Sequence, residues 1–196
     1  MTASRPLTIT VFGSSRPAPG SEAYETARRL GAALAEAGFA VATGGYSGTM
    51  EGVSRGAREA RLPARSAGGP DGQAGGHVIG VTAEALSSRA NQWVEEEIRV
   101  KTWQERLFKL IELGAGYVVL PGGTGTLVEL AVVWEWINKG FLAEKPVVIL
   151  GDFWQPVVAA IPATELRSSP IHRASTVKDV VTFLCREIDP HLEQPK

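Results

Sequence analysis

Residues 121–129 form the segment whose composition and spacing point most clearly to chemistry, with the sequence PGGTGTLVE. Its glycines allow backbone N–H groups to approach an anion closely. The helical pattern that follows offers unpaired N–H groups and the positive end of a helix dipole. Together these features predict a phosphate-binding site at the start of a helix. The residues expected to bind the phosphate are Gly122, Gly123, Thr124, Gly125 and Thr126.

Glu129, the last residue of this segment, supports two interpretations. Thr126 and Glu129 have the spacing of a capping box, in which Thr126 is the N-cap and Glu129 satisfies an unpaired backbone N–H at the helix start. In the second interpretation, a carboxylate one turn inside a phosphate-binding helix points toward the ligand and acts on it. The two roles are compatible, and the residues alone leave both open.

Two more loops rich in glycine and hydroxyl groups follow predicted strands. The first strand ends in Gly13-Ser14-Ser15-Arg16, and the second ends in Gly44-Gly45-Tyr46-Ser47-Gly48-Thr49. Ligands of doubly wound sheets bind outside the carboxyl ends of the strands, so we expect all three loops at one edge. The loop at 121–126 is not a Walker A loop, because no Gly-Lys-Ser/Thr follows it. The dinucleotide fingerprint is also absent after the first strand, so NAD binding in the usual mode is not expected.

The elements that must position these loops follow from the apolar patterns. Strands alternating with helices predict a parallel sheet, and continuous apolar runs such as 147–150 indicate strands covered on both faces. The fold class is therefore α/β, a doubly wound, Rossmann-like parallel sheet with helices on both faces, in one domain spanning residues 1–196. If the strand order is 3-2-1-4-5, the loops after the first and fourth strands face each other across one crevice. The predicted strands are Leu7–Gly13, Phe39–Gly45, His77–Thr82, Gly116–Leu120 and Pro146–Gly151, and the predicted helices are 22–37, 49–61, 92–112, 127–139, 153–161 and 176–188.

Arg106 lies on the predicted helix 92–112. Arg99 and Arg106 are one heptad apart, so they would share a face beside the apolar stripe that includes Trp103 and Leu107. From the residues alone, a solvated face with the neighbouring glutamates is the simpler interpretation. The tryptophans on this helix and the next are expected to pack in the core or in a dimer rather than on a base. They are Trp103, Trp134 and Trp136.

Composition excludes several classes of protein and site. The net charge is −1, with 20 basic and 21 acidic residues, so a strongly basic nucleic-acid or membrane-surface binder is not expected. The single cysteine, Cys185, reads as a buried residue of a helix, and the three histidines have no metal-ligand spacing, so no metal site is expected. The first apolar run is too short for a signal peptide and no window approaches a membrane span, so we expect a cytoplasmic protein. Residues 62–76 read as a mobile surface loop, either a tolerated insertion or, less favoured, a lid.

At the level of motifs, the chain resembles the Lonely Guy (LOG) family. Pro121 to Glu129 is similar to that family's PGGxGTxxE signature, and residues 103–106 take the place of its Met-His-x-Arg-Lys stretch. Residues 11–15 resemble its first phosphate loop, and residues 44–50 are similar to its GGGxxGLM segment. The resemblance covers roughly residues 7–151.

This resemblance implies a Rossmann-like homodimer, or a higher homo-oligomer, that cleaves the N-glycosidic bond of a nucleoside 5′-monophosphate without a metal or organic cofactor. The products would be the free base and ribose 5-phosphate. Glu129 would stabilise the developing ribosyl cation or activate water, and Arg106 would position the nucleotide. The loop 122–126 would hold the 5′-phosphate, and the pocket would be completed by Gly13, Ser14, Ser15, Gly44 and Gly45.

The sequence departs from the family pattern where the base and ribose are expected to bind. The family's histidine and lysine around the arginine are Gln104 and Leu107 here, its run of three glycines is reduced to Gly44-Gly45 before Tyr46, and its leucine before methionine is Thr49. The base specificity is therefore left open between purine and cytokinin-type nucleotides such as AMP.

Two other functions compete with this hydrolase. The first is a non-catalytic binding protein for a phosphorylated ligand, like a molybdenum cofactor carrier. The second is a lysine decarboxylase that depends on pyridoxal phosphate, a label that LOG-like sequences often carry. It requires a Schiff-base lysine, and none of the six lysines lies in a recognisable motif for that cofactor.

Overall fold

Strands and helices alternate along the chain, as the apolar patterns predict. The structure is a computed structural model, and it describes residues 6–64, 76–86, 89–167 and 171–188. The elements, in chain order, are β1 (Thr8–Phe12), α1 (Glu22–Glu36), β2 (Ala40–Thr43), α2 (Thr49–Ala64), β3 (Val78–Ala83), η1 (Glu84–Leu86), β4 (Glu96–Val100), α3 (Trp103–Leu113), β5 (Gly116–Val119), α4 (Thr124–Lys139), β6 (Val147–Leu150), α5 (Gln155–Ala159), η2 (Ala163–Glu165), β7 (Ile171–Ala174) and α6 (Val177–Ile188).

The strands form one parallel sheet in the order β4-β3-β2-β1-β5-β6-β7. The order expected for the five predicted strands, 3-2-1-4-5, is confirmed as β3-β2-β1-β5-β6. From β1 the chain builds the sheet in one direction as far as β4, then returns to the centre and continues from β5 in the other direction. β1 and β5 are hydrogen-bonded neighbours, with Val11 opposite Val118. The edge beyond these two strands is the topological switch point of the sheet, where ligands of this fold bind.

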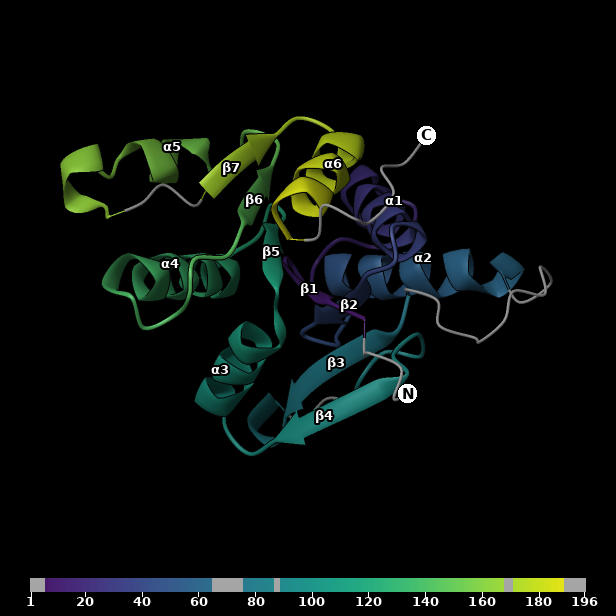
Figure 1. The fold of residues 1–196 in the computed structure, drawn as a ribbon. Coiled ribbons are helices and arrows are strands. Elements are labelled where there is room, and N and C mark those ends of the chain that lie inside the picture. The colour runs from purple at the N-terminus through teal and green to yellow at the C-terminus, as the bar shows by residue number, and fades with distance from the viewer. Residues whose placement is uncertain (1–5, 65–75, 87–88, 168–170, 189–196) are drawn as a thin grey trace, which may run out of the picture.

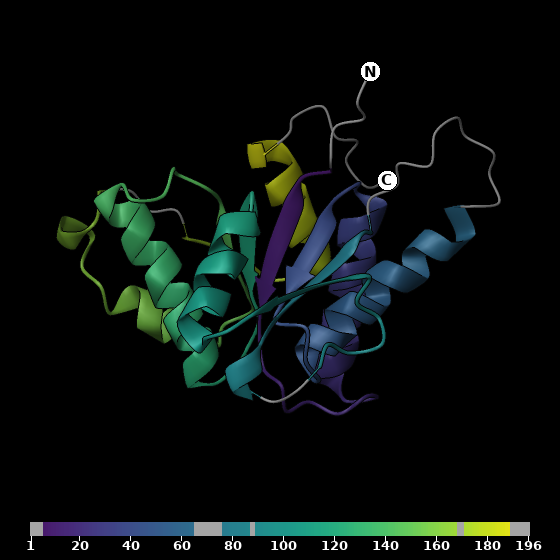
Figure 2. The same cartoon turned by 90° about the horizontal axis from the view of Figure 1, so that it is seen from below.

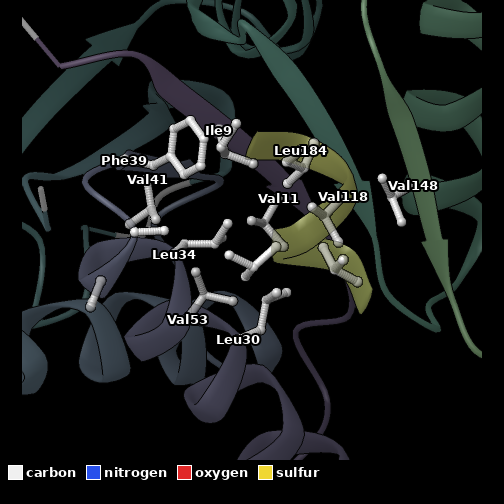
Figure 3. Packing of buried hydrophobic residues seen from close by; sticks show 14 of the residues in the cluster. Ile9, Val11, Leu30, Leu34, Phe39, Val41, Val53, Val118, Val148 and Leu184 are labelled. Carbon is white, nitrogen blue, oxygen red and sulfur yellow. The ribbon is translucent and has the colours of Figure 1, made fainter. Parts of the chain in front are cut away.

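Helices cover both faces of the sheet, which confirms the doubly wound fold class. Successive strand residues point to opposite faces, so Ile9 and Val11 of β1 pack with α1, α2 and α6, whereas Phe12 packs with α3 and α4. Figures 1 and 2 show these two layers on opposite sides of the sheet. Figure 3 shows the first cluster, where Leu30 and Leu34 of α1 meet the strands. Cys185 is buried in this cluster, as predicted.

The predicted helix 92–112 is wrong, because its first part is the strand β4 and only its second part is the helix α3. β4 pairs with β3, and Ile98 and Val100 alternate with more exposed residues, as on a half-covered edge strand. The Thr102 hydroxyl then accepts the Glu105 N–H at 3.1 Å and caps α3. Arg99 therefore lies in a strand and does not share a helix face with Arg106.

Smaller differences concern the ends of elements. The edge strand β7 was not predicted, and α2 extends through residues 62–64 of the predicted loop 62–76. Residues 65–75 of that loop lie outside the described residues. Trp134 is buried, and Trp103 and Trp136 are partly buried against the cluster under α3 and α4. Within the described residues, no helix is both long and apolar enough to cross a membrane.

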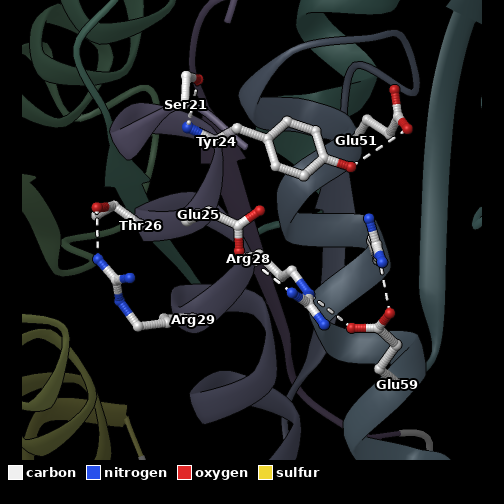
Figure 4. A network of polar contacts seen from close by, with 9 residues as sticks. Ser21, Tyr24, Glu25, Thr26, Arg28, Arg29, Glu51 and Glu59 are labelled. Carbon is white, nitrogen blue, oxygen red and sulfur yellow. Dashed lines mark hydrogen bonds and ion pairs between the residues drawn. The ribbon is translucent and has the colours of Figure 1, made fainter. Parts of the chain in front are cut away.

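The helices α1 and α2 pack unusually close together through glycines. A Cβ on Gly56 would overlap the carbonyl oxygen of Arg28, and a Cβ on Gly31 would overlap the backbone of Val53. Ion pairs connect the outer surfaces of the two helices (Figure 4). Arg28 Nε and Arg55 Nε donate to the Glu59 carboxylate at 2.7 and 2.8 Å. These contacts fix the two helices that flank β1 and β2 on one face of the sheet.

Candidate active site

The three predicted loops meet at one cavity of about 1010 Å³ outside the carboxyl ends of β1, β2 and β5. The crevice expected at the switch point is thus present. Most of the predicted site residues line it, namely Gly13, Ser14, Ser15, Arg106, Gly122, Gly123, Thr124, Gly125, Thr126 and Glu129. Gly44 and Gly45 do not line the cavity, and the structure gives them supporting positions instead.

The loop after β1 is held against the start of α2. The Thr49 N–H and hydroxyl both donate to the Ser14 carbonyl, at 2.8 and 3.1 Å. The Ser47 hydroxyl donates to the Ser15 carbonyl at 3.0 Å. Gly48 has a φ of 74°, and a Cβ there would overlap the Ser14 carbonyl, so this contact requires glycine. The Ser14 hydroxyl accepts the Arg16 N–H at 3.1 Å, so contacts behind the loop and within it fix its shape at the cavity.

The loop after β5 leads directly into α4, and here the predicted capping box is wrong. The helix begins at Thr124 with Gly123 as N-cap and without a side-chain cap, so Thr126 and Glu129 stand three residues further inside than predicted. The N–H groups of the first turn lack intrahelical acceptors. A Cβ on Gly123 or Gly125 would meet no protein atom within 4 Å, so the backbone here is open to the cavity. This end of α4 is able to receive an anion through backbone N–H groups and the helix dipole.

Arg106 projects from α3 into the base of the cavity, where it is 6% exposed. Its Nε donates to the Val81 carbonyl at 2.8 Å, and its Nη2 lies 3.9 Å from Met50 Sδ. A Cβ on Gly44 would overlap Nη2, so Gly44 provides the space that the guanidinium occupies. The simpler interpretation of Arg106 as part of a solvated face is therefore wrong.

Glu129 lies beside Arg106 and is 8% exposed. Its Oε1 is 3.6 Å from Arg106 Nη1, an ion pair that is longer than a hydrogen bond. Burial raises the pKa of Glu129 to about 7, because the desolvation of the carboxylate outweighs the attraction of Arg106. A carboxyl group of this kind exchanges a proton near neutral pH, as a general acid or base does.

Several cavity residues were not predicted as site residues. Arg16 ends the first loop, Tyr46 lies in the second and Met50 directly follows it, so their neighbours were a usable signal. Leu86 and Phe153 come from η1 and from the turn before α5, and are 43% and 56% exposed at the cavity. No local pattern connects these two apolar side chains to the loops. They add exposed apolar surface to the cavity, on which a flat ring is able to pack.

Comparison with known proteins matches this chain to one family model and to several named relatives. The model of a family described as "Possible lysine decarboxylase" matches residues 62–182. A cytokinin riboside 5′-monophosphate phosphoribohydrolase from Rhodococcoides fascians is 28% identical over 191 residues, covering 94% of this chain and 86% of that protein. A protein of the same name from Mycobacterium tuberculosis is 31% identical over 152 residues, covering 75% of this chain and 71% of its own.

Solved structures share the fold over almost the whole chain. A structural-genomics X-ray structure has 26% identity and a TM-score of 0.71, covering 92% of this chain and 99% of its own. The molybdenum cofactor carrier protein from Chlamydomonas reinhardtii has 25% identity and a TM-score of 0.67, covering 93% of this chain and 98% of its own. The sequence relatives thus include proteins named as enzymes, and the solved structures include a protein named as a carrier.

Proposed function

Since this chain belongs to the LOG family, whose model is described as "Possible lysine decarboxylase", we propose that it is a hydrolase of nucleoside 5′-monophosphates. The bond cleaved is the N-glycosidic bond between base and ribose, and the products are the free base and ribose 5-phosphate. The observation that carries this proposal is the buried carboxylate of Glu129 beside Arg106, in the same cavity as a helix N-terminus suited to phosphate.

The 5′-phosphate is assigned to the loop that begins α4. The open backbone at Gly123 and Gly125 lets an anion approach the first-turn N–H groups, and Thr124 is exposed and lines the same cavity. Ser14 and Ser15, in the loop after β1, line the same cavity. Phosphate bound between these loops would place the ribose toward the base of the cavity, where Glu129 lies.

Glu129 is assigned the chemical step. As the bond from C1′ to the base nitrogen breaks, its electron pair leaves with the base and C1′ becomes cationic. The Glu129 carboxylate stabilises this cation and takes a proton from the water whose oxygen bonds to C1′. The departing nitrogen takes up a proton from solvent, and Glu129 returns the proton it took from water to solvent, so one water is consumed for each free base released. A pKa of about 7 makes Glu129 a stronger base than an ordinary carboxylate while leaving it ionised in a large fraction of molecules near neutral pH.

Incubation of the purified protein with AMP, followed by chromatography of free adenine, tests this proposal. We expect adenine and ribose 5-phosphate in equal amounts, and release abolished by Glu129→Ala. The base preference follows from a panel of purine, pyrimidine and cytokinin-type monophosphates. The enzyme proposal would be contradicted if no nucleotide in the panel released its base while AMP bound tightly.

That contradicting result would favour a second function, a non-catalytic carrier of a phosphorylated ligand. The likeness to the Chlamydomonas carrier supports this alternative, because a shared fold does not by itself imply a shared chemical reaction. The decarboxylase in the family description is less well supported. It needs a lysine that forms a Schiff base with the cofactor, and within the described residues no lysine lines this cavity.

We also propose that the chain forms a homodimer through α3 and α4. Phe108 is 47% exposed on α3 and stacks on Trp136 of α4 with 5.2 Å between ring centroids. A second copy would cover this aromatic surface. Light scattering that finds only monomers at micromolar concentration would contradict the dimer.

A further inference from the structure

The guanidinium of Arg106 has a protein partner for every nitrogen and for one of its faces. Nε donates to the Val81 carbonyl, Nη2 faces Met50 Sδ, and Nη1 faces Glu129 Oε1. The ring of Tyr46 lies against the group, with 5.2 Å between Arg106 Cζ and the ring centroid. At this distance the negative face of the ring attracts the cation.

Tyr46 is itself held firmly. Its hydroxyl accepts the Ala83 N–H at 3.0 Å, and its carbonyl accepts the Asn91 side-chain amide at 3.0 Å. The same amide donates to the Gly45 carbonyl, and Gly45 takes a φ of 76° to make the turn. The ring is therefore fixed at both ends, by its hydroxyl and by its backbone, against the strand β3 and the segment before β4.

The separation of Arg106 from Glu129 is not set by these two residues alone. At 3.6 Å they are not hydrogen-bonded, so their mutual attraction does not define one geometry. The contact with Met50 sulfur is also weak. The strong restraints on the guanidinium are the bond to Val81 and the ring of Tyr46, with Gly44 leaving the space between them.

We propose that Tyr46 is a positioning residue, which holds the Arg106 guanidinium at the distance from Glu129 that the reaction needs. This inference rests on the proposed function, since it assigns Tyr46 a part in the same site.

The experiment compares three variants of Tyr46 by steady-state kinetics with AMP across pH. Tyr46→Phe keeps the ring, Tyr46→Leu keeps bulk without a ring, and Tyr46→Gly removes both. We expect kcat to fall about tenfold for the leucine and glycine variants, with KM changed less, and to recover to within about threefold for phenylalanine. We also expect the pH midpoint of kcat to move upward in the first two, because Arg106 opposes the rise in the pKa of Glu129. Tyr24→Phe is the control for hydroxyl loss, because the Tyr24 hydroxyl donates to Glu51, and neither residue lines the cavity.

Full kcat with an unshifted pH profile in Tyr46→Leu would overturn the proposal, as would a change confined to KM. If the wild-type protein releases no base from any nucleotide, the proposed function fails, and the positioning is then judged without activity. For that case, the ¹⁵N NMR signal of Arg106 Nε–H is followed in hydrogen exchange. Faster exchange in Tyr46→Leu and Tyr46→Gly, with wild-type exchange in Tyr46→Phe, is expected, and unchanged exchange in all three would overturn the proposal.

Discussion

The α1–α2 helix pair and the cavity at the switch point both pair glutamate with arginine, with opposite results. Glu59 on α2 accepts hydrogen bonds from Arg28 and Arg55, all three side chains being roughly one third exposed. Glu129 in the cavity is nearly buried and has Arg106 at 3.6 Å. Burial alone would raise the pKa of Glu59, but the two hydrogen bonds outweigh it and lower that pKa. For Glu129 the burial dominates, and the pKa rises to about 7.

The difference shows what separates a structural ion pair from a chemically active one. Two hydrogen bonds stabilise the charged form of Glu59, so this carboxylate stays ionised at neutral pH and connects two helices. One cation without a hydrogen bond leaves the charge of Glu129 under-compensated. The cavity thus holds a carboxylate that binds a proton more tightly than an ordinary glutamate, which is the property that a general base requires.

Two glycines differ in the same way, one serving the packing of the fold and the other lying open at the cavity. Gly56 of α2 allows a neighbouring backbone to approach, because a Cβ there would overlap the Arg28 carbonyl. Gly123 at the start of α4 has no protein atom in the place of a Cβ, and it borders the cavity. The space beside Gly56 is filled by the neighbouring helix, whereas the space beside Gly123 is open to a ligand.

The largest expected effect separates the two glutamates by activity. Glu129→Gln keeps the shape of the side chain but removes its basicity, so we expect kcat for release of adenine from AMP to fall about 10³-fold. Glu59→Gln is the matched control and should retain the kcat of the wild type. Chromatography of the products measures both rates. Equal losses in the two variants would mean that the contrast between the pairs has no bearing on function.

The next effect is a pH dependence of stability with opposite signs for the two carboxylates. The pKa of Glu129 is raised from 4.5 to about 7 on folding, so the folded protein binds this proton more tightly than the unfolded chain. Its contribution to stability is full below about pH 4.5 and is lost as the pH rises to about 7, by about 3 kcal/mol. Glu59 has a lowered pKa, so its contribution is lost only as the pH falls below the ordinary range of a glutamate.

Urea unfolding between pH 5 and pH 8 measures the Glu129 contribution, with Glu129→Gln as the control. The free energy of unfolding of the variant should exceed that of the wild type at pH 8 and approach it at pH 5. Parallel curves for the two proteins across this range would show that Glu129 is not the titrating group.

Local patterns in the sequence were sufficient for the sheet and for the loops of the site. Apolar runs such as Val147–Leu150 need only their own residues to indicate a buried parallel strand, and glycine-rich turns after them indicate the binding edge. The edge strand β4 was missed because its pairing partner β3 decides its conformation, while the spacing of Val100, Trp103 and Leu107 also suits a helix.

The side-chain geometry of the site depends on contacts between distant parts of the chain. Thr126 has the chemistry of an N-cap, but the backbone of the turn after β5 places Gly123 in that position instead. The stacking of Tyr46 on Arg106 joins β2's loop to α3, and the ion pair joins α3 to α4. Burial by these elements also sets the pKa of Glu129, so no spacing rule could have given it.

A smaller effect tests the two kinds of glycine. Gly56→Ala forces α1 and α2 apart, so we expect it to lower the free energy of unfolding by about 2 kcal/mol. The activity per folded molecule should remain that of the wild type. Gly123→Ala is the matched variant in the cavity, where we expect a stability change below about 0.5 kcal/mol, together with weaker AMP binding in calorimetry. An equal loss of stability in both variants would remove the distinction between structural and ligand-facing glycines.

The smallest effect concerns salt and the exposed pair. Glu59→Gln should lower the free energy of unfolding at low ionic strength by less than about 1 kcal/mol, because exposed ion pairs contribute little. This difference should shrink further as sodium chloride is raised, since salt screens charges near the surface. The pair of Arg106 and Glu129 is shielded by burial, so the pH midpoint of Glu129 should move far less over the same salt range. Urea unfolding of the wild type and of Glu59→Gln, at low and high salt, measures the first response. A pH titration of the wild type at the same two salt concentrations measures the second. If the pH midpoint of Glu129 depends on salt as strongly as the contribution of Glu59 to stability does, the pair of Arg106 and Glu129 is exposed to solvent and is not shielded by burial.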